Sequence, residues 1–261
     1  MFRSSRIPFL TTVAILLFFY IPIAILVVNS FNASSTGGAW GGWTLKWYQK
    51  LFSNEEIWRA VWNSLKIGFA STAVSTIVGT SAAFALYKYA STRLQKVHGI
   101  VLYMPLVVPE ILMGISLLMF FVAIRLPLGL FAIFLAHVTF SMSYVAMVVL
   151  SRLQDFDATL IEAAQDLGAD AWLTARKILL PLISPGIVAG ALLAFTLSVD
   201  DFVITFFVSG PGSTTLPVKV YSMIKHSRDL PVINALSALM MVLTFAIVLL
   251  SQRQKRRGAT P

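Results

Sequence analysis

Long apolar runs dominate the pattern of hydrophobic and polar positions along the chain. A membrane-spanning helix needs about 20 mostly apolar residues in succession. Six runs reach this length with few or no formal charges, and they cover residues 9–28, 67–86, 100–124, 126–150, 182–209 and 232–251. The pattern therefore predicts an all-α integral membrane protein with about six transmembrane helices, forming a single transmembrane domain over residues 1–261.

Composition agrees with the membrane class and narrows the candidate chemistry. Only 12% of the residues are charged, against about 25% in a typical soluble domain. The chain has no cysteine, and its three histidines, His98, His137 and His226, are scattered. We therefore expect no metal site, no cofactor and no catalytic residue. His137 lies inside an apolar run, which favours a packed, hydrogen-bonded histidine over a functional one.

The net charge of +9 at first suggests a nucleic-acid partner. The basic residues flank the apolar runs, however, as they do when they set the orientation of a membrane protein. With a cytoplasmic N-terminus, twelve of the 20 lysines and arginines lie on the cytoplasmic side. The first run exceeds the apolar stretch of a signal peptide, and no small-residue cleavage site follows it. We expect a retained first helix, both termini in the cytoplasm and no nucleic-acid partner.

The polar stretch 151–181 between the fourth and fifth runs predicts two short helices. Asp157 is placed to cap the first helix, and Gly168 to stop it with a positive φ. Asp170 is placed to cap the second helix, which Pro181 is expected to end. From propensity alone, this stretch could also be a simple connector at the membrane surface.

The residue identities in this stretch are more informative about function than its helix propensities. They resemble the EAA loop of permease subunits of ATP-binding-cassette (ABC) importers at every fixed position, namely Glu162, Ala163, Ala164, Gly168, Ile178, Leu180 and Pro181. The resemblance implies a type I (MetI-like) architecture in which this loop docks on a separate ATPase. The chain has no glycine-rich phosphate-binding loop of its own. We therefore expect a non-catalytic permease that works with two ATPase subunits.

Three acids lie inside the apolar runs: Glu110, Asp200 and Asp201. A carboxylate at mid-bilayer costs about 2.5–3.5 kcal/mol on insertion scales, so such residues usually face a cavity or a partner. Pro109, with Pro105 one turn earlier, predicts a broken third span. Asp200 and Asp201 are adjacent, so on a continuous helix their side chains would diverge by about 100°. The acids could line a pathway for a cation, or could only brace neighbouring helices.

A second resemblance concerns the substrate. The chain is similar to the PotC type of spermidine/putrescine permease along most of its length, including the stretch 198–203, Pro109–Glu110 and the stretch 137–140. It departs at position 110, where relatives can carry aspartate. The resemblance implies a bacterial cytoplasmic (inner) membrane, a polyamine substrate, a second homologous permease subunit and a periplasmic or lipid-anchored substrate-binding protein. Another small cationic or zwitterionic amine is the alternative substrate.

Two other classes of membrane protein fit the sequence less well. A membrane enzyme would need a nucleophile–base pair or a metal cluster in a cavity, and the sequence suggests neither. An ion channel would need a filter loop in a symmetric pore, and the stretch 151–181 would have no role there. Co-purification of an ATPase would separate an importer from both.

Overall fold

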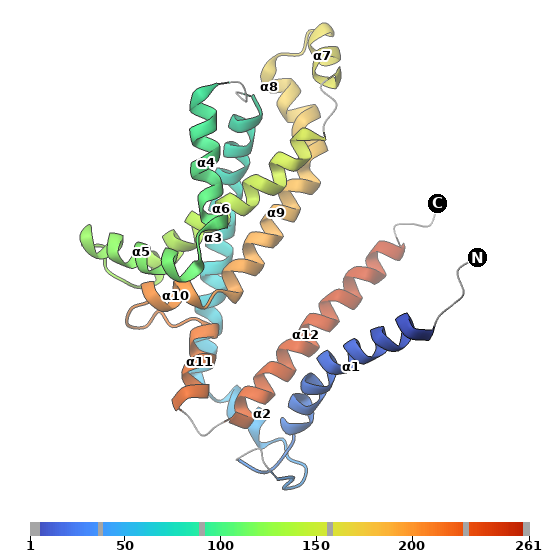
Figure 1. The fold of residues 1–261 in the computed structure, drawn as a ribbon, viewed down its shortest axis with the longest axis vertical. Coiled ribbons are helices and arrows are strands. Elements are labelled where there is room, and N and C mark those ends of the chain that lie inside the picture. Colours follow the sequence, from blue (N-terminus) through green and yellow to red (C-terminus); the bar gives the residue numbers. More distant parts are fainter. Residues whose placement is uncertain (1–5, 36–38, 89–91, 156–158, 227–229, 258–261) are drawn as a thin grey trace. The chain divides into compact units, whose positions relative to one another are not determined.

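The computed structural model describes residues 6–35, 39–88, 92–155, 159–226 and 230–257. Within these ranges the regular structure is helical, and the one β contact is an isolated bridge between Asn32 and Trp43. The helices (Figure 1) are α1 (Arg6–Asn29), α2 (Lys46–Phe52), α3 (Glu55–Lys88), α4 (Arg93–Val107), α5 (Glu110–Ala123), α6 (Leu130–Gln154), α7 (Thr159–Asp166), α8 (Ala171–Thr174), a π-helical turn η1 (Ala175–Leu179), α9 (Leu180–Asp200), α10 (Val203–Val208), α11 (Leu216–His226) and α12 (Leu230–Arg257).

The described helices confirm the predicted all-α membrane class. Four segments are long and apolar enough to cross a bilayer: Pro8–Asn29, Glu55–Lys88, Leu130–Gln154 and Trp172–Asp200. A fifth is the bent pair Lys96–Val107 and Glu110–Ala123, and Leu230–Phe245 is a shorter apolar helix. The number of six spans stays a prediction.

The chain divides into two compact units, and each is described by itself. Unit 1 comprises Met1–Trp58 and Val220–Pro261. In it, α12 packs against both α1 and α2. The connection after α1 is organised by the buried Asn32, whose amide oxygen accepts from the N–H groups of Ser34 and Gly41. The Trp47 indole donates to the Asn32 carbonyl over 2.7 Å, which fixes α2 against this connection.

Unit 2 comprises Arg59–Lys219 and is built around α6. The most extensive packing joins α6 to α9, and small residues allow it. A Cβ at Gly190 would lie 3.3 Å from the Cα of Val145, and a Cβ at Gly186 only 2.5 Å from the Cγ of Arg152. Such close backbone approach is how membrane helices gain van der Waals contact without a hydrophobic driving force.

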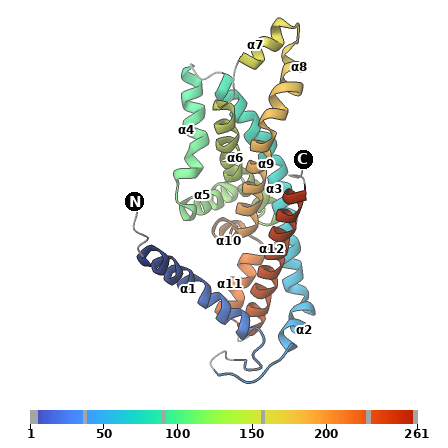
Figure 2. The same cartoon turned by 90° about the vertical axis from the view of Figure 1, so that its right-hand side faces the viewer.

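Two short helices, α5 and α10, pack against each other at some distance from α7 and α8, which lie in the polar stretch 151–181. The Cβ of a side chain at Gly114 on α5 would lie 2.7 Å from the Phe207 ring on α10. In both views α5 and α10 lie side by side, and α7 and α8 lie at the end of the unit where α4 begins (Figures 1 and 2). Each of α5 and α10 follows a break in a longer apolar segment.

Candidate functional site: a cavity at two helix breaks

The first break separates α4 from α5. The two helices form an angle of 111°, and Pro109 stands at the N-cap of α5 in an extended conformation, with φ −54° and ψ 134°. Proline has no N–H to donate and restricts the residue before it, so the chain leaves the helix here. The predicted break of the third span is confirmed, and Glu110 becomes the first residue of α5.

The second break, between α9 and α10, contradicts the expectation of a continuous span over residues 182–209. α9 ends at Asp200, and Asp201 is extended, with φ −64° and ψ 124°. The Asp201 carboxylate accepts from the backbone N–H of Thr205 at 2.8 Å and, more weakly, of Ile204 at 3.4 Å. A side chain that bonds nearby N–H groups in this way competes with helical pairing. The predicted divergence of Asp200 and Asp201 around one helix is therefore wrong, since only Asp200 is helical.

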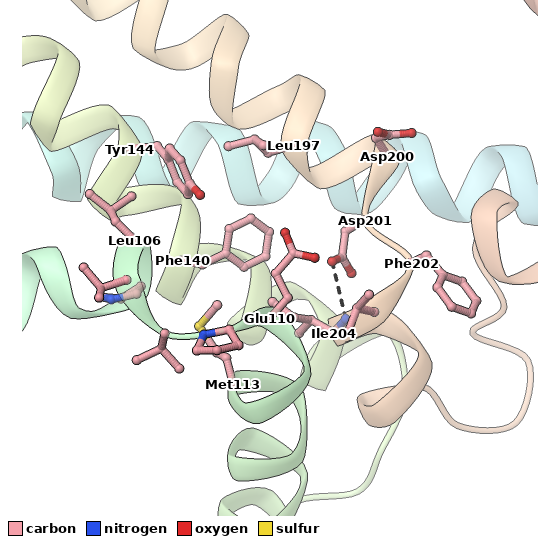
Figure 3. Close-up of a pocket in the computed structure, with 15 residues that line it drawn as sticks. Leu106, Glu110, Met113, Phe140, Tyr144, Leu197, Asp200, Asp201, Phe202 and Ile204 are labelled. Atoms are coloured by element: carbon pink, nitrogen blue, oxygen red, sulfur yellow. Dashed lines mark hydrogen bonds between the residues drawn. The ribbon is translucent and has the colours of Figure 1, made fainter.

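Both breaks border one cavity of about 480 Å³, and all three predicted acids line it. Among the described lining residues there is no lysine, arginine or histidine. The wall consists of Pro105, Leu106, Val107, Val108, Pro109, Glu110, Met113, Phe140, Tyr144, Leu197, Asp200, Asp201, Phe202, Val203 and Ile204. Figure 3 shows the Glu110 and Asp201 carboxylates pointing toward each other, whereas that of Asp200 points another way.

The three acids differ in their surroundings. Glu110 and Asp200 are exposed, and neither has a hydrogen-bond or ion-pair partner in the part of the chain that the structure describes. The Asp201 side chain is only 7% exposed and is held by several donors. The sequence predicted the three acids as candidates, and the structure shows that they line one cavity.

A buried histidine supports Asp201. His137 on α6 is fully buried, and its Nε2 lies 2.9 Å from the Thr205 hydroxyl and 3.3 Å from Asp201 Oδ2. Its Nδ1 lies 2.7 Å from the Ser198 hydroxyl, which lies 3.0 Å from that of Ser71 on α3. The expected packed, hydrogen-bonded histidine is confirmed. Its contact with Asp201 was missed, because no local sequence signal links residues so far apart.

The segment 151–181 has the predicted turn at Gly168, whose φ is +83°. The N–H of Gly168 bonds to Gln165 and that of Ala169 to Ala164, the pair of bonds by which a left-handed residue closes a helix end. In this segment Glu162, Ala163 and Pro181 are exposed, Leu180 is 38% exposed, Ile178 is half-buried and Ala164 is buried.

The second half of this segment differs from the prediction. Asp170 caps α8 as expected, with its Oδ1 2.6 Å from the Leu173 N–H, whereas Asp157 lies outside the described residues. Pro181 does not end the helix. The chain continues from α8 through the π-helical turn into α9, giving one apolar segment, Trp172–Asp200. Pro181 lies in the first turn of α9, where a missing N–H is tolerated.

Comparisons with known proteins identify the family. Residues 75–257 match the family described as binding-protein-dependent transport system inner membrane component. The chain is 43% identical over 241 residues to the spermidine/putrescine transport system permease protein PotC of Haemophilus influenzae, covering 92% of this chain and 93% of that one. It is 42% identical to the putrescine transport system permease protein PotI of Escherichia coli K12, covering 86% and 82%.

Solved structures show the same fold. The structure of a bacterial ABC transporter involved in the import of alginate superposes with a TM-score of 0.72 and 16% identity, covering 98% of each chain. The MetNI methionine ABC transporter superposes with a TM-score of 0.66 and 22% identity, covering 80% of this chain and 100% of that one. These likenesses confirm the type I importer permease architecture. The chain belongs to the family of binding-protein-dependent transport system inner membrane components, together with the PotC and PotI permeases.

Proposed function

We propose that the chain is a permease subunit of an ABC importer that carries polyamines, spermidine or putrescine, across the membrane. The observation that carries the proposal is the cavity at the two helix breaks. It brings together Glu110, Asp200 and Asp201 with no basic side chain among its described lining residues. The similarity to PotC and PotI supports polyamines as the cations concerned.

Charge and desolvation both favour a polyamine in this cavity. A polyamine carries several ammonium groups at neutral pH and loses hydration when it enters a narrow pathway. Carboxylates beside the apolar wall of a cavity attract such groups more strongly than they would in bulk water. An ammonium between Glu110 and Asp201 would also relieve the repulsion of these two like charges, which point toward each other in Figure 3.

Aromatic and apolar walls suit the rest of a polyamine. Phe140, Tyr144 and Phe202 line the same cavity as the acids. A ring face near an ammonium group contributes about 0.5–2 kcal/mol, with the larger values in desolvated sites. The methylene segments between amines can contact the aliphatic wall. A passenger with charges separated by apolar carbon chains therefore fits the alternation of acids and apolar groups.

Energy for transport comes from other subunits in this proposal. A second homologous permease completes the pathway, two ATPase subunits hydrolyse ATP, and a periplasmic or lipid-anchored binding protein delivers the polyamine. This chain then performs no catalysis. The coupling contact with the ATPase is made by the segment 151–181 through Glu162, Ala163, Ala164, Gly168, Ile178, Leu180 and Pro181. The complex lies in the bacterial cytoplasmic membrane, with both termini and this segment in the cytoplasm.

The test is uptake by a complete importer. The chain and its partner subunits are produced in a bacterial host that lacks its own polyamine importers, and uptake of labelled spermidine and putrescine is measured. ATP-dependent accumulation of either one, abolished when this chain is omitted, supports the proposal. Assembly of the subunits with no polyamine accumulation contradicts it.

Another small cationic or zwitterionic amine is the alternative passenger. Competition distinguishes the two cases, since an excess of the true substrate suppresses uptake of the labelled one. A zwitterion brings a negative group into a cavity with three carboxylates, where it meets repulsion that a polyamine does not. We therefore expect unlabelled polyamines to compete and zwitterionic amines to have no effect.

A further inference from the structure

The hydrogen bonds around Asp201 assign directions to the protons of the buried network. The Thr205 hydroxyl donates to Asp201 Oδ2 at 2.7 Å, so its oxygen is left to accept. The neighbouring nitrogen, His137 Nε2, lies 2.9 Å from that oxygen and must therefore carry a proton. Nε2 is thus a donor directed at the Thr205–Asp201 pair, whereas Nδ1 interacts with Ser198 on the opposite side of the ring.

We propose that His137 is a positioning residue for the substrate pathway: its Nε2–H holds the Asp201 carboxylate in the orientation that faces Glu110. This inference rests on the proposed function. Asp201 Oδ2 receives the donors of the network, whereas Oδ1 has, among the described residues, one long contact, 3.4 Å from the backbone N of Ile204. The carboxylate is thereby fixed on one side and free to meet an ammonium on the other.

A positioning residue is needed here because the backbone does not supply the rigidity. Asp201 lies between α9 and α10, outside both helices, so no helical ladder holds it. The network instead ties the break to two long helices, through His137 on α6 and through Ser198 and Ser71 to α3. If the Nε2 donor is lost, Asp201 keeps its bonds to Thr205 and Ile204, but its direct link to α6 is gone, so the break can shift and carry the carboxylate away from Glu110.

Two substitutions distinguish the contributions of the two ring nitrogens of His137. The amide of His137→Gln is attached one carbon further out and reaches the position of Nε2, so it keeps a donor for Thr205 and Asp201. The amide of His137→Asn reaches only the position of Nδ1 and keeps the contact with Ser198. Ser141→Ala is the matched control, since Ser141 is buried on the same helix and its hydroxyl has no hydrogen-bond partner among the described residues.

The transport test measures KM and maximal rate in proteoliposomes that contain the complete importer. We expect His137→Asn to raise the KM for polyamine about tenfold, as for one lost hydrogen bond to a charged group, with the maximal rate per assembled importer little changed. His137→Gln and Ser141→Ala should keep the KM of the parent. A role confined to stability would reduce the amount of importer and leave the KM unaltered in every variant, which overturns the proposal.

A second measurement needs no substrate. The chain has no cysteine, so Val203→Cys provides a single thiol on the cavity wall beside the break. His137→Asn should make this thiol react faster with a methanethiosulfonate reagent in the purified importer, whereas His137→Gln should not. If His137→Asn does not assemble, Thr205→Val can replace it, since it removes the hydroxyl that lies between His137 Nε2 and Asp201. This variant should make the Val203→Cys thiol react faster in the same way. Equal reactivity in all variants overturns the positioning role. Faster reactivity with no polyamine transport even by the parent contradicts the proposed function alone.

Discussion

At the scale of single residues, the three carboxylates of the cavity are held in different ways. Asp201 is bound by a histidine, a threonine hydroxyl and backbone N–H groups. Glu110 and Asp200 are exposed and have no partner within the described residues. An acid inside an apolar segment is costly, so two acids without partners at one cavity favour a binding role over bracing. Because only Asp201 has partners, we expect the adjacent residues Asp200 and Asp201 to respond differently to neutralisation.

Neutralising the two aspartates one at a time tests this difference. Asp201→Asn should lower the midpoint of thermal unfolding, because charge-assisted hydrogen bonds of about 1.5–3 kcal/mol become neutral ones. Asp200→Asn removes no such bond and should not lower the midpoint. Thermal unfolding of the purified importer, followed by tryptophan fluorescence, measures both. Equal shifts of the midpoint would show that the network around Asp201 does not stabilise the break.

The sequence identified these acids but not the contacts that hold Asp201. Charges inside apolar runs mark Glu110, Asp200 and Asp201 without any structure, and the surroundings of His137 predict a packed, hydrogen-bonded ring. The contact between His137 and Asp201 could not be predicted. It requires α6, α9 and α10 to pack around one point, and that packing depends on glycines and side-chain shapes far apart in the sequence.

At the scale of elements, the two breaks have different causes. The break before α5 is caused by Pro109 and was predicted from the sequence. The break after α9 has no proline or glycine within it, and side-chain bonding by Asp201 takes the place of helical pairing. The helix expected to end at Pro181 continues instead, because a π-helical turn precedes a proline that stands in the first turn of α9.

Gly168 provides the test at this scale. Its φ of +83° is strained for a residue with a Cβ by about 1–2 kcal/mol, although a Cβ there would meet no atom of the described residues within 4 Å. Gly168→Val should therefore distort the end of α7 and lower the number of substrate molecules imported per ATP hydrolysed. Gly168→Asn is the matched control, since asparagine tolerates a positive φ, and should keep most of the coupling. Normal coupling in the valine variant would contradict the proposed role of the turn at Gly168 in the coupling contact with the ATPase.

At the scale of the whole molecule, the family and the fold agree with the apolar pattern, and the orientation in the membrane stays a prediction. The structure contains four long apolar helices and one bent pair within the described residues. The shorter apolar helix Leu230–Phe245 would complete the six spans predicted from the sequence. An even number of spans places both termini on one side, and the basic residues near the C-terminus favour the cytoplasm.

Single cysteines test the orientation directly, because the chain has none of its own. Ser53 lies between the first two predicted spans, residues 9–28 and 67–86, and therefore outside the cell if the N-terminus is cytoplasmic. In intact cells, an impermeant thiol reagent should label Ser53→Cys and should not label Gly258→Cys. Opening the cells should make the second thiol reactive. Labelling of Gly258→Cys in intact cells would reverse the proposed orientation and place the segment 151–181 away from a cytoplasmic ATPase.

The carboxylates of the cavity are proposed to bind a cation on its way through the membrane. The direct measurement is polyamine uptake by proteoliposomes containing the complete importer with Glu110→Gln, Asp200→Asn and Asp201→Asn combined, normalised to assembled protein. Losing two or more contacts of about 1.5–3 kcal/mol each predicts that the uptake rate at low substrate concentration falls at least about a hundredfold. Near-normal uptake by this triple variant would contradict a cationic pathway lined by these acids, because transport would then not depend on their negative charge.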